Sequence, residues 1–195
     1  GHVVAELERD GVARGVVVST SVSDPTSLAG GGEAMGSCTA GFAVRNVGVG
    51  AILTAGHCPE VATLYDTSQG GNDPVALSTS YEDGYHGWVD NGGQIYHVDR
   101  QLHTVLNPHN TDPAIRYDSG TNPRHAVVGS ASVQVGHTVC KYGKTSQHEE
   151  CGLVTLVRAP NAQTGVGSVQ VRGTAVADID VRAGDSGGPV YTDAG

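Results

Sequence analysis

Residues 184–189, Gly-Asp-Ser-Gly-Gly-Pro, place a serine hydroxyl on a turn without bulky neighbours. Gly187 and Gly188 lack a Cβ atom, so another polypeptide can approach Ser186 closely. In such a turn the amides of Gly184 and Ser186 can point the same way as the hydroxyl, which is what an oxyanion hole requires. A plain surface turn is the alternative, and the rarity of the full hexapeptide disfavours it. The motif therefore predicts an alcohol nucleophile with an oxyanion hole formed by Gly184 and Ser186.

A hydroxyl nucleophile needs a base at neutral pH. Residues 52–58, Ile-Leu-Thr-Ala-Gly-His-Cys, offer that base in His57, where an apolar run ends in small residues. Cys58 follows directly and can hold the histidine in place. The base needs in turn an acid that orients it, so a third residue is expected elsewhere in the chain.

These two motifs resemble those of the chymotrypsin-like serine proteases, and more narrowly those of the secreted bacterial branch of streptogrisin and alpha-lytic type. The segments 54–58 and 184–189 match that family's two most specific signatures, in the family's order of histidine first and serine last. The resemblance covers residues 31–195. It implies an all-β fold of two packed antiparallel six-stranded Greek-key barrels. It also implies a secreted serine endopeptidase with a Ser-His-Asp triad and an acyl-enzyme intermediate.

The resemblance implies an orienting acid in residues 110–117, Asn-Thr-Asp-Pro-Ala-Ile-Arg-Tyr. Bacterial members carry a similar string at this place, and Asp112 matches its aspartate. This chain departs from the string by one inserted residue before the aspartate and by Pro113 after it, which removes a backbone donor. Asp99 and Asp118 are competing aspartates. The expected triad is therefore His57, Asp112 and Ser186.

Asp185 stands beside the nucleophile, and in the family this buried carboxylate needs a cation that keeps the oxyanion turn in shape. In the streptogrisin branch the cation is a basic side chain early in the second lobe. Lys141 matches that place, although arginine is more usual there. The expectation is a structural Lys141–Asp185 pair, and the alternative is a solvated surface lysine.

Asp180 is the one sequence feature that bears on substrate preference. It lies six residues before Ser186, the spacing at which trypsin carries the acid that selects lysine or arginine. Bacterial relatives have a disulfide cysteine at this position, so Asp180 is alternatively a replacement for that cysteine. The second interpretation is favoured because the rest of the chain resembles the bacterial branch.

The four cysteines allow three disulfide pairings, which sequence alone does not distinguish. An even number without a Cys-x-x-Cys motif favours an oxidising, extracellular setting over a zinc or redox site. The resemblance favours the pairs Cys38–Cys58 and Cys140–Cys151. The histidines other than His57 show no paired metal spacing, so no metal and no cofactor are expected.

Composition limits the class of protein and of partner. A chain of 195 residues is long enough for one sizeable domain or two small packed lobes. Its 29 glycines and few aromatic residues favour short strands and tight turns. A formal net charge of -9 disfavours nucleic acid and anionic membranes, and no apolar run approaches membrane-spanning length. The expected partners are polypeptide substrates and proteinaceous inhibitors, and the expected state is a monomer.

The expected organisation has four parts along the chain. They are an N-terminal extension or pro-region remnant (1–30), a first barrel (31–117), an inter-barrel linker (118–125) and a second barrel (126–195). An arm packed on the core is the alternative for the first part, and the glycine run at 29–32 is expected to be a flexible boundary.

The second barrel is expected to be incomplete, because relatives continue for a few dozen residues beyond the point where this sequence stops. Three alternatives to an active endopeptidase follow. They are a catalytically silent binding module on the same scaffold, a piece that is inactive without the absent segment, and a serine esterase with the same three residues.

Overall fold

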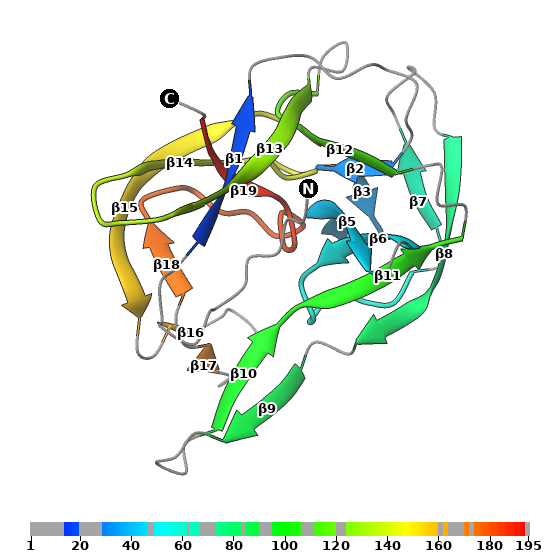
Figure 1. The fold of residues 1–195 in the computed structure, drawn as a ribbon, viewed down its shortest axis with the longest axis horizontal. Helices are drawn as coiled ribbons and strands as arrows, with labels where there is room; N and C mark the ends of the chain where they lie inside the picture. Colours follow the sequence, from blue (N-terminus) through cyan, green and yellow to red (C-terminus); the bar gives the residue numbers. More distant parts are fainter. Residues whose placement is uncertain are drawn as a thin grey trace.

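The computed structural model describes residues 14–19, 29–46, 49–61, 63–66, 73–82, 85–89, 95–106, 111–119, 124–159, 162–163, 170–171 and 174–193. Every regular element within these ranges is a β-strand, and the strands form three sheets (Figure 1). None of the described residues forms a helix long and apolar enough to cross a membrane. The expectation of an all-β fold is confirmed.

One sheet has seven strands in the order β4-β3-β7-β8-β11-β6-β5. Its members are β3 (Ala34–Met35), β4 (Cys38–Thr39), β5 (Phe42–Asn46), β6 (Val49–Thr54), β7 (Thr63–Asp66), β8 (Asp73–Glu82) and β11 (Gln101–Val105). In β11 buried side chains alternate with half-buried ones, as expected for a strand with one face on a core. The buried apolar residues of this half are Met35, Ala40, Ile52, Leu64, Val75, Leu77 and Val105.

A second sheet has eight strands in the order β18-β15-β14-β19-β1-β13-β12-β2. Its members are β1 (Arg14–Ser19), β2 (Ala29–Gly31), β12 (Thr111–Arg116), β13 (Arg124–Ser132), β14 (Thr138–Lys141), β15 (Glu150–Ala159), β18 (Thr174–Ala177) and β19 (Val190–Asp193). Two apolar clusters lie along it, one around Ile115 and Tyr191 and one around Val139 and Val154.

A smaller third sheet has the order β16-β17-β10-β9. It contains β9 (Tyr85–Val89), β10 (Ile95–Asp99), β16 (Ala162–Gln163) and β17 (Gln170–Val171). Only Arg100 separates β10 from β11, so the two strands form one long ribbon that links this sheet to the seven-stranded one (Figure 1). Asp99 is the last residue of β10 and therefore lies at the junction of these two strands.

The N-terminal strand β1 lies inside the eight-stranded sheet. It pairs antiparallel with β13, from Arg14↔Ser132 to Ser19↔Ala126, and parallel with β19. Further along, residues 30–32 are buried, and β2 pairs with β12. The glycine run is therefore a packed junction and not the flexible boundary expected from the sequence.

The eight-stranded sheet also contains β12, which the sequence analysis assigned to the first barrel. The strand pairs antiparallel with β13 and parallel with β2. Strand β12 is therefore joined by backbone hydrogen bonds to β13, most of which lies in the segment expected to form the second barrel. The divisions at residues 30, 117 and 125 stay predictions.

Candidate active site

The turn that carries His57 begins where β6 ends. Thr54 Oγ1 donates a hydrogen bond to the Thr39 carbonyl (2.9 Å), and the Cys58 amide donates to the Ala55 carbonyl (3.1 Å). The disulfide Cys38–Cys58, the pair that the resemblance favoured, ties the same turn to β4. The half-buried His57 is thus fixed at its backbone on both sides.

The turn that carries Ser186 packs directly on the end of β6. The Thr39 amide donates a hydrogen bond to the Ser186 carbonyl (2.9 Å). A Cβ atom on Gly187 would lie 2.1 Å from Thr54 Oγ1 and 2.7 Å from the Ala55 amide nitrogen, and Gly187 has a φ of 81°. Only glycine fits such a position. The serine turn and the histidine turn therefore lie against each other, although they come from different halves of the molecule.

Asp185 lies beneath the serine turn, and its carboxylate is buried and fully hydrogen-bonded. Its Oδ2 atom accepts from Lys141 Nζ (2.7 Å) and from the Ser146 hydroxyl. Its Oδ1 atom accepts from the amides of Thr145 (3.1 Å) and Ser146 (3.0 Å). Burial acts to raise the pKa of Asp185, but the hydrogen bonds from Lys141 and Ser146 outweigh it and lower the pKa to about 2. The carboxylate is charged at neutral pH.

Lys141 is 5% exposed, so the alternative of a solvated surface lysine is wrong. Its ammonium also lies 2.7 Å from Glu150 Oε2, and this hydrogen bond lowers the pKa of Glu150. One buried cation thus holds two carboxylates. Ser146 could not be predicted from the sequence, because a serine in a polar loop carries no local signal of such a role.

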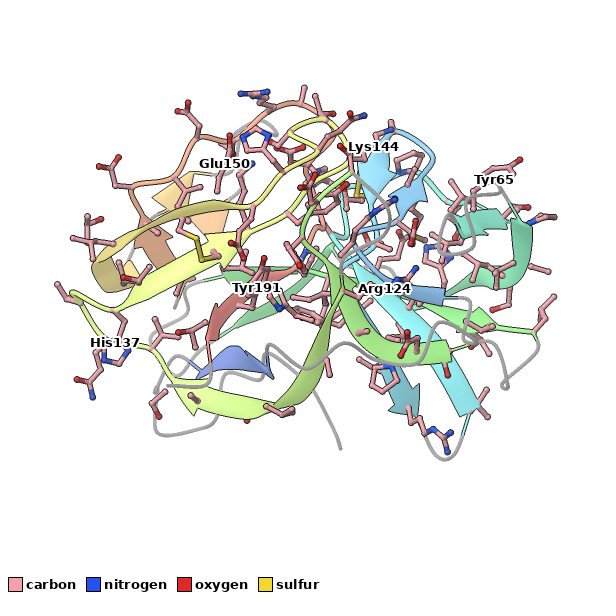
Figure 2. All side chains as sticks on the ribbon, turned by 90° about the horizontal axis from the view of Figure 1, so that it is seen from above. Tyr65, Arg124, His137, Lys144, Glu150 and Tyr191 are labelled. Carbon is pink, nitrogen blue, oxygen red and sulfur yellow. A yellow bond between two sulfur atoms is a disulfide. The ribbon has the colours of Figure 1, made fainter. Side chains whose placement is uncertain are left out.

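Asp112 is buried in a cluster of charged side chains. Arg124 Nη1 lies 3.6 Å from Asp112 Oδ2, and Arg124 Nη2 lies 2.6 Å from Glu33 Oε1. Glu33 is 0% exposed and Arg124 is 3% exposed. Figure 2 shows Arg124 near the middle of the molecule, between its two halves. The cluster links β12, β13 and the segment after β2.

The neighbour of Asp112 in the chain shows which end of β6 this cluster occupies. A Cβ atom on Gly50 would lie 2.7 Å from Thr111 Cγ2, so Thr111 lies directly over Gly50. Gly50 is at the start of β6, whereas His57 follows the end of that strand. This packing does not favour Asp112 as the acid that orients His57.

Asp99 lies at the other end of β6. Strand β11 pairs antiparallel with β6, with Gln101 opposite Thr54 and Leu102 opposite Leu53. In an antiparallel pair, residues that precede Gln101 lie beside residues that follow Thr54. The backbone of Asp99 is therefore at the same end of the ladder as His57. Strand register thus favours Asp99, a competing aspartate in the sequence analysis, over Asp112.

The remaining acidic candidates are exposed. Asp180 lies between β18 and β19, and its role in substrate selection stays a prediction. Asp118 forms an isolated β-bridge with His148.

Two groups of potential metal ligands lie close together among the described residues. They are Cys38, His57 and Cys58, and Cys140, Glu149 and Cys151. In both groups the cysteines are joined to each other as disulfides, Cys38–Cys58 and Cys140–Cys151. Zinc binds cysteine as a thiolate, so neither group offers that ligand while its disulfide is intact.

Comparison with known proteins found a protein of similar sequence, but no family model matches the chain. The chain is 29% identical over 187 residues to streptogrisin-D of Streptomyces griseus. That alignment covers 93% of this chain and 43% of streptogrisin-D, so the chain spans less than half of the relative's length.

Three solved protease structures have folds similar to that of this chain. A Nocardiopsis protease matches with a TM-score of 0.57 and 25% identity, over 84% of this chain and 78% of that one. Thermobifida fusca protease A matches with a TM-score of 0.53 and 22% identity, over 84% and 77%. A glutamic acid specific serine protease matches with a TM-score of 0.57 and 22% identity, over 85% and 80%. The chain is thus similar to streptogrisin-D in sequence and to these proteases in fold.

Proposed function

We propose that the chain is a serine endopeptidase in which Ser186 is the nucleophile and His57 is the general base. The observation that carries this proposal is the packing of Gly187 on Thr54 and Ala55, which brings the serine and histidine turns into contact. Both turns carry the motifs of serine proteases, and both histidine and serine are half-buried, so a substrate can reach them.

The reaction would proceed in two halves. Ser186 Oγ attacks the scissile carbonyl carbon while His57 takes the hydroxyl proton, and the carbonyl electron pair moves onto oxygen. The resulting oxyanion accepts hydrogen bonds from the Gly184 and Ser186 amides. The carbon–nitrogen bond then breaks as His57 returns the proton to the leaving amine. Water repeats the sequence on the acyl-enzyme, which releases the acid and restores the serine.

For the orienting acid we propose Asp99. Its backbone position beside the end of β6 supports this assignment, because His57 follows that strand and the acid must lie within reach of the imidazole. The contacts of Asp112 with Arg124 support a structural role for that carboxylate.

Hydrolysis assays separate the proposed activity from its alternatives. The wild-type chain and Ser186→Ala would each be assayed with two substrates, a denatured protein and a simple ester. Cleavage of both by the wild type alone supports the endopeptidase. Cleavage of the ester alone indicates a serine esterase. Failure of the wild type on both substrates indicates a silent binding module or an inactive piece.

Two further features of the proposal concern setting and substrate. Disulfides in both halves of the chain support an extracellular, oxidising location. The substrates would be polypeptides, and proteinaceous inhibitors would bind the same site. Comparison of arginyl with leucyl and phenylalanyl amide substrates tests the role of Asp180, because a selective acid predicts preference for arginine.

A further inference from the structure

The backbone around the nucleophile is held at four consecutive carbonyl groups, from residue 183 to residue 186. Each carbonyl accepts a hydrogen bond from a described donor. The bonds are Thr145 Oγ1 to the Ala183 carbonyl (2.8 Å), Thr39 Oγ1 to Gly184 (2.7 Å), the Gly188 amide to Asp185 (2.9 Å) and the Thr39 amide to Ser186 (2.9 Å). Two of the donors are side-chain hydroxyls, one from each half of the molecule.

Holding a carbonyl also fixes the direction of the next amide. In a trans peptide the N–H points opposite to the C=O of the same unit, and the described chain has no cis peptide bond. The bond to the Ala183 carbonyl therefore directs the Gly184 N–H, and the bond to the Asp185 carbonyl directs the Ser186 N–H. These are the two amides of the proposed oxyanion hole, and neither donates a hydrogen bond to another described residue.

The contact between Thr145 and the first of these peptides is tight. Gly184 has a φ of 101°, and a Cβ atom on it would lie 2.4 Å from Thr145 Oγ1. The hydroxyl therefore packs against the Cα atom of Gly184 while it donates to the preceding carbonyl. A glycine at position 184 is required for both reasons.

Thr145 is itself held in place by the buried charges beneath the turn. Its amide donates to Asp185 Oδ1 (3.1 Å), and the amide of Lys144 donates to Thr39 Oγ1 (3.0 Å). Figure 2 shows Lys144 where the loop from one half meets the strands of the other. The loop that presents the Thr145 hydroxyl is thus anchored both to the serine turn and to the opposite half.

From these contacts we infer that Thr145 is a positioning residue for the oxyanion hole, whose hydroxyl directs the Gly184 N–H toward the developing oxyanion. This inference rests on the proposed function. Hydrogen bonds to an oxyanion strengthen in the transition state, so a misdirected amide slows the reaction more than it weakens substrate binding.

Two variants of one residue test the inference. Thr145→Val keeps the shape of the side chain and removes the hydroxyl, whereas Thr145→Ser keeps the hydroxyl. Phosphonate titration of active sites would precede the kinetics, so that kcat is expressed per reactive serine. We expect Thr145→Val to lower kcat for a peptide amide by about 10- to 100-fold with KM within about twofold. Thr145→Ser should stay within about threefold of the wild type in both constants.

A second readout separates positioning from a loss of structure. A peptide aldehyde forms a hemiacetal with the serine and places its oxygen in the oxyanion hole. Its inhibition constant should rise in Thr145→Val by about the same factor as kcat falls, because both report transition-state contacts. A merely structural role would lower the thermal midpoint and the titrated fraction, and leave kcat per site unchanged.

The outcomes distinguish this inference from the proposed function. A reactive wild type and a Thr145→Val variant with equal kcat per titrated site overturn the inference alone. An equal fall in kcat per titrated site in Thr145→Ser and Thr145→Val also overturns the inference, because the hydroxyl would then have no effect on the reaction. A wild type that neither cleaves peptides nor reacts with the phosphonate overturns the proposed function, and the inference with it.

Discussion

Replacement of Lys141 by methionine would leave the buried carboxylate of Asp185 without its cation. The two charged atoms are 2.7 Å apart, and both side chains are buried. Removal of one partner from a buried ion pair costs about 3–5 kcal/mol, because the remaining charge is left uncompensated. We expect the free energy of unfolding of Lys141→Met to fall by about this amount at pH 7.

The same pair predicts how the effect changes with pH. In the wild type the pKa of Asp185 is lowered from 3.8 to about 2, and the difference corresponds to about 2 kcal/mol of stability. Because the folded state has the lower pKa, this stability is present above about pH 4 and is lost as the pH falls toward about 2. In Lys141→Met burial raises the pKa of Asp185, and protonation then relieves the uncompensated charge. The difference in free energy of unfolding between the wild type and Lys141→Met should therefore decrease from pH 7 to pH 3.

Urea unfolding followed by circular dichroism at pH 7, 5 and 3 measures both effects. Lys144→Met is the matched control, because this half-buried lysine lies in the same loop and its ammonium donates a hydrogen bond to the backbone carbonyl of Gly36, with no carboxylate among its described partners. The free energy of unfolding of Lys144→Met should fall by at most about 3 kcal/mol, and this fall should not depend on pH. The reasoning would be refuted if Lys141→Met and Lys144→Met lost the same free energy of unfolding. It would also be refuted if the loss in Lys141→Met did not change with pH.

The remaining predictions concern the orienting acid and the N-terminal strand. Asp99→Asn should lower kcat for peptide hydrolysis by about 10⁴-fold, because the histidine loses the acid that sets its tautomer. Asp112→Asn should keep kcat within about tenfold and lower the urea midpoint, because Asp112 lies beside the buried Arg124. If kcat instead falls by about 10⁴-fold in Asp112→Asn and stays within about tenfold in Asp99→Asn, Asp112 is the orienting acid. Val17→Pro should lower stability by at least about 1 kcal/mol in thermal unfolding, because β1 pairs on both sides. An unchanged midpoint would show that β1 does not support the sheet.

Local motifs predicted the parts of the site that depend on nearby residues. His57 follows an apolar strand and precedes a cysteine, and Ser186 stands among glycines, so both turns are encoded within a few residues. Lys141 and Asp185 are far apart in sequence, and only the family resemblance brought them together. The structure contains this pair at 2.7 Å.

Long-range register explains what the sequence could not supply. Asp99 lies just before β11 and Asp112 lies at the start of β12, and both short strands contain buried positions, so their local patterns are alike. Which strand pairs with β6 depends on contacts across the whole sheet. The ion pair between Glu33 and Arg124 and the place of β1 between β13 and β19 likewise join segments far apart along the chain.

The most direct measurement is the reaction of the native chain with a fluorophosphonate, followed by intact mass and peptide mapping. The proposed chemistry predicts one adduct per chain, located on Ser186, with no adduct on Ser186→Ala and a much slower reaction of His57→Ala. A native chain that forms no adduct, or an adduct that persists in Ser186→Ala, would contradict the claim that these two turns form a nucleophile and its base.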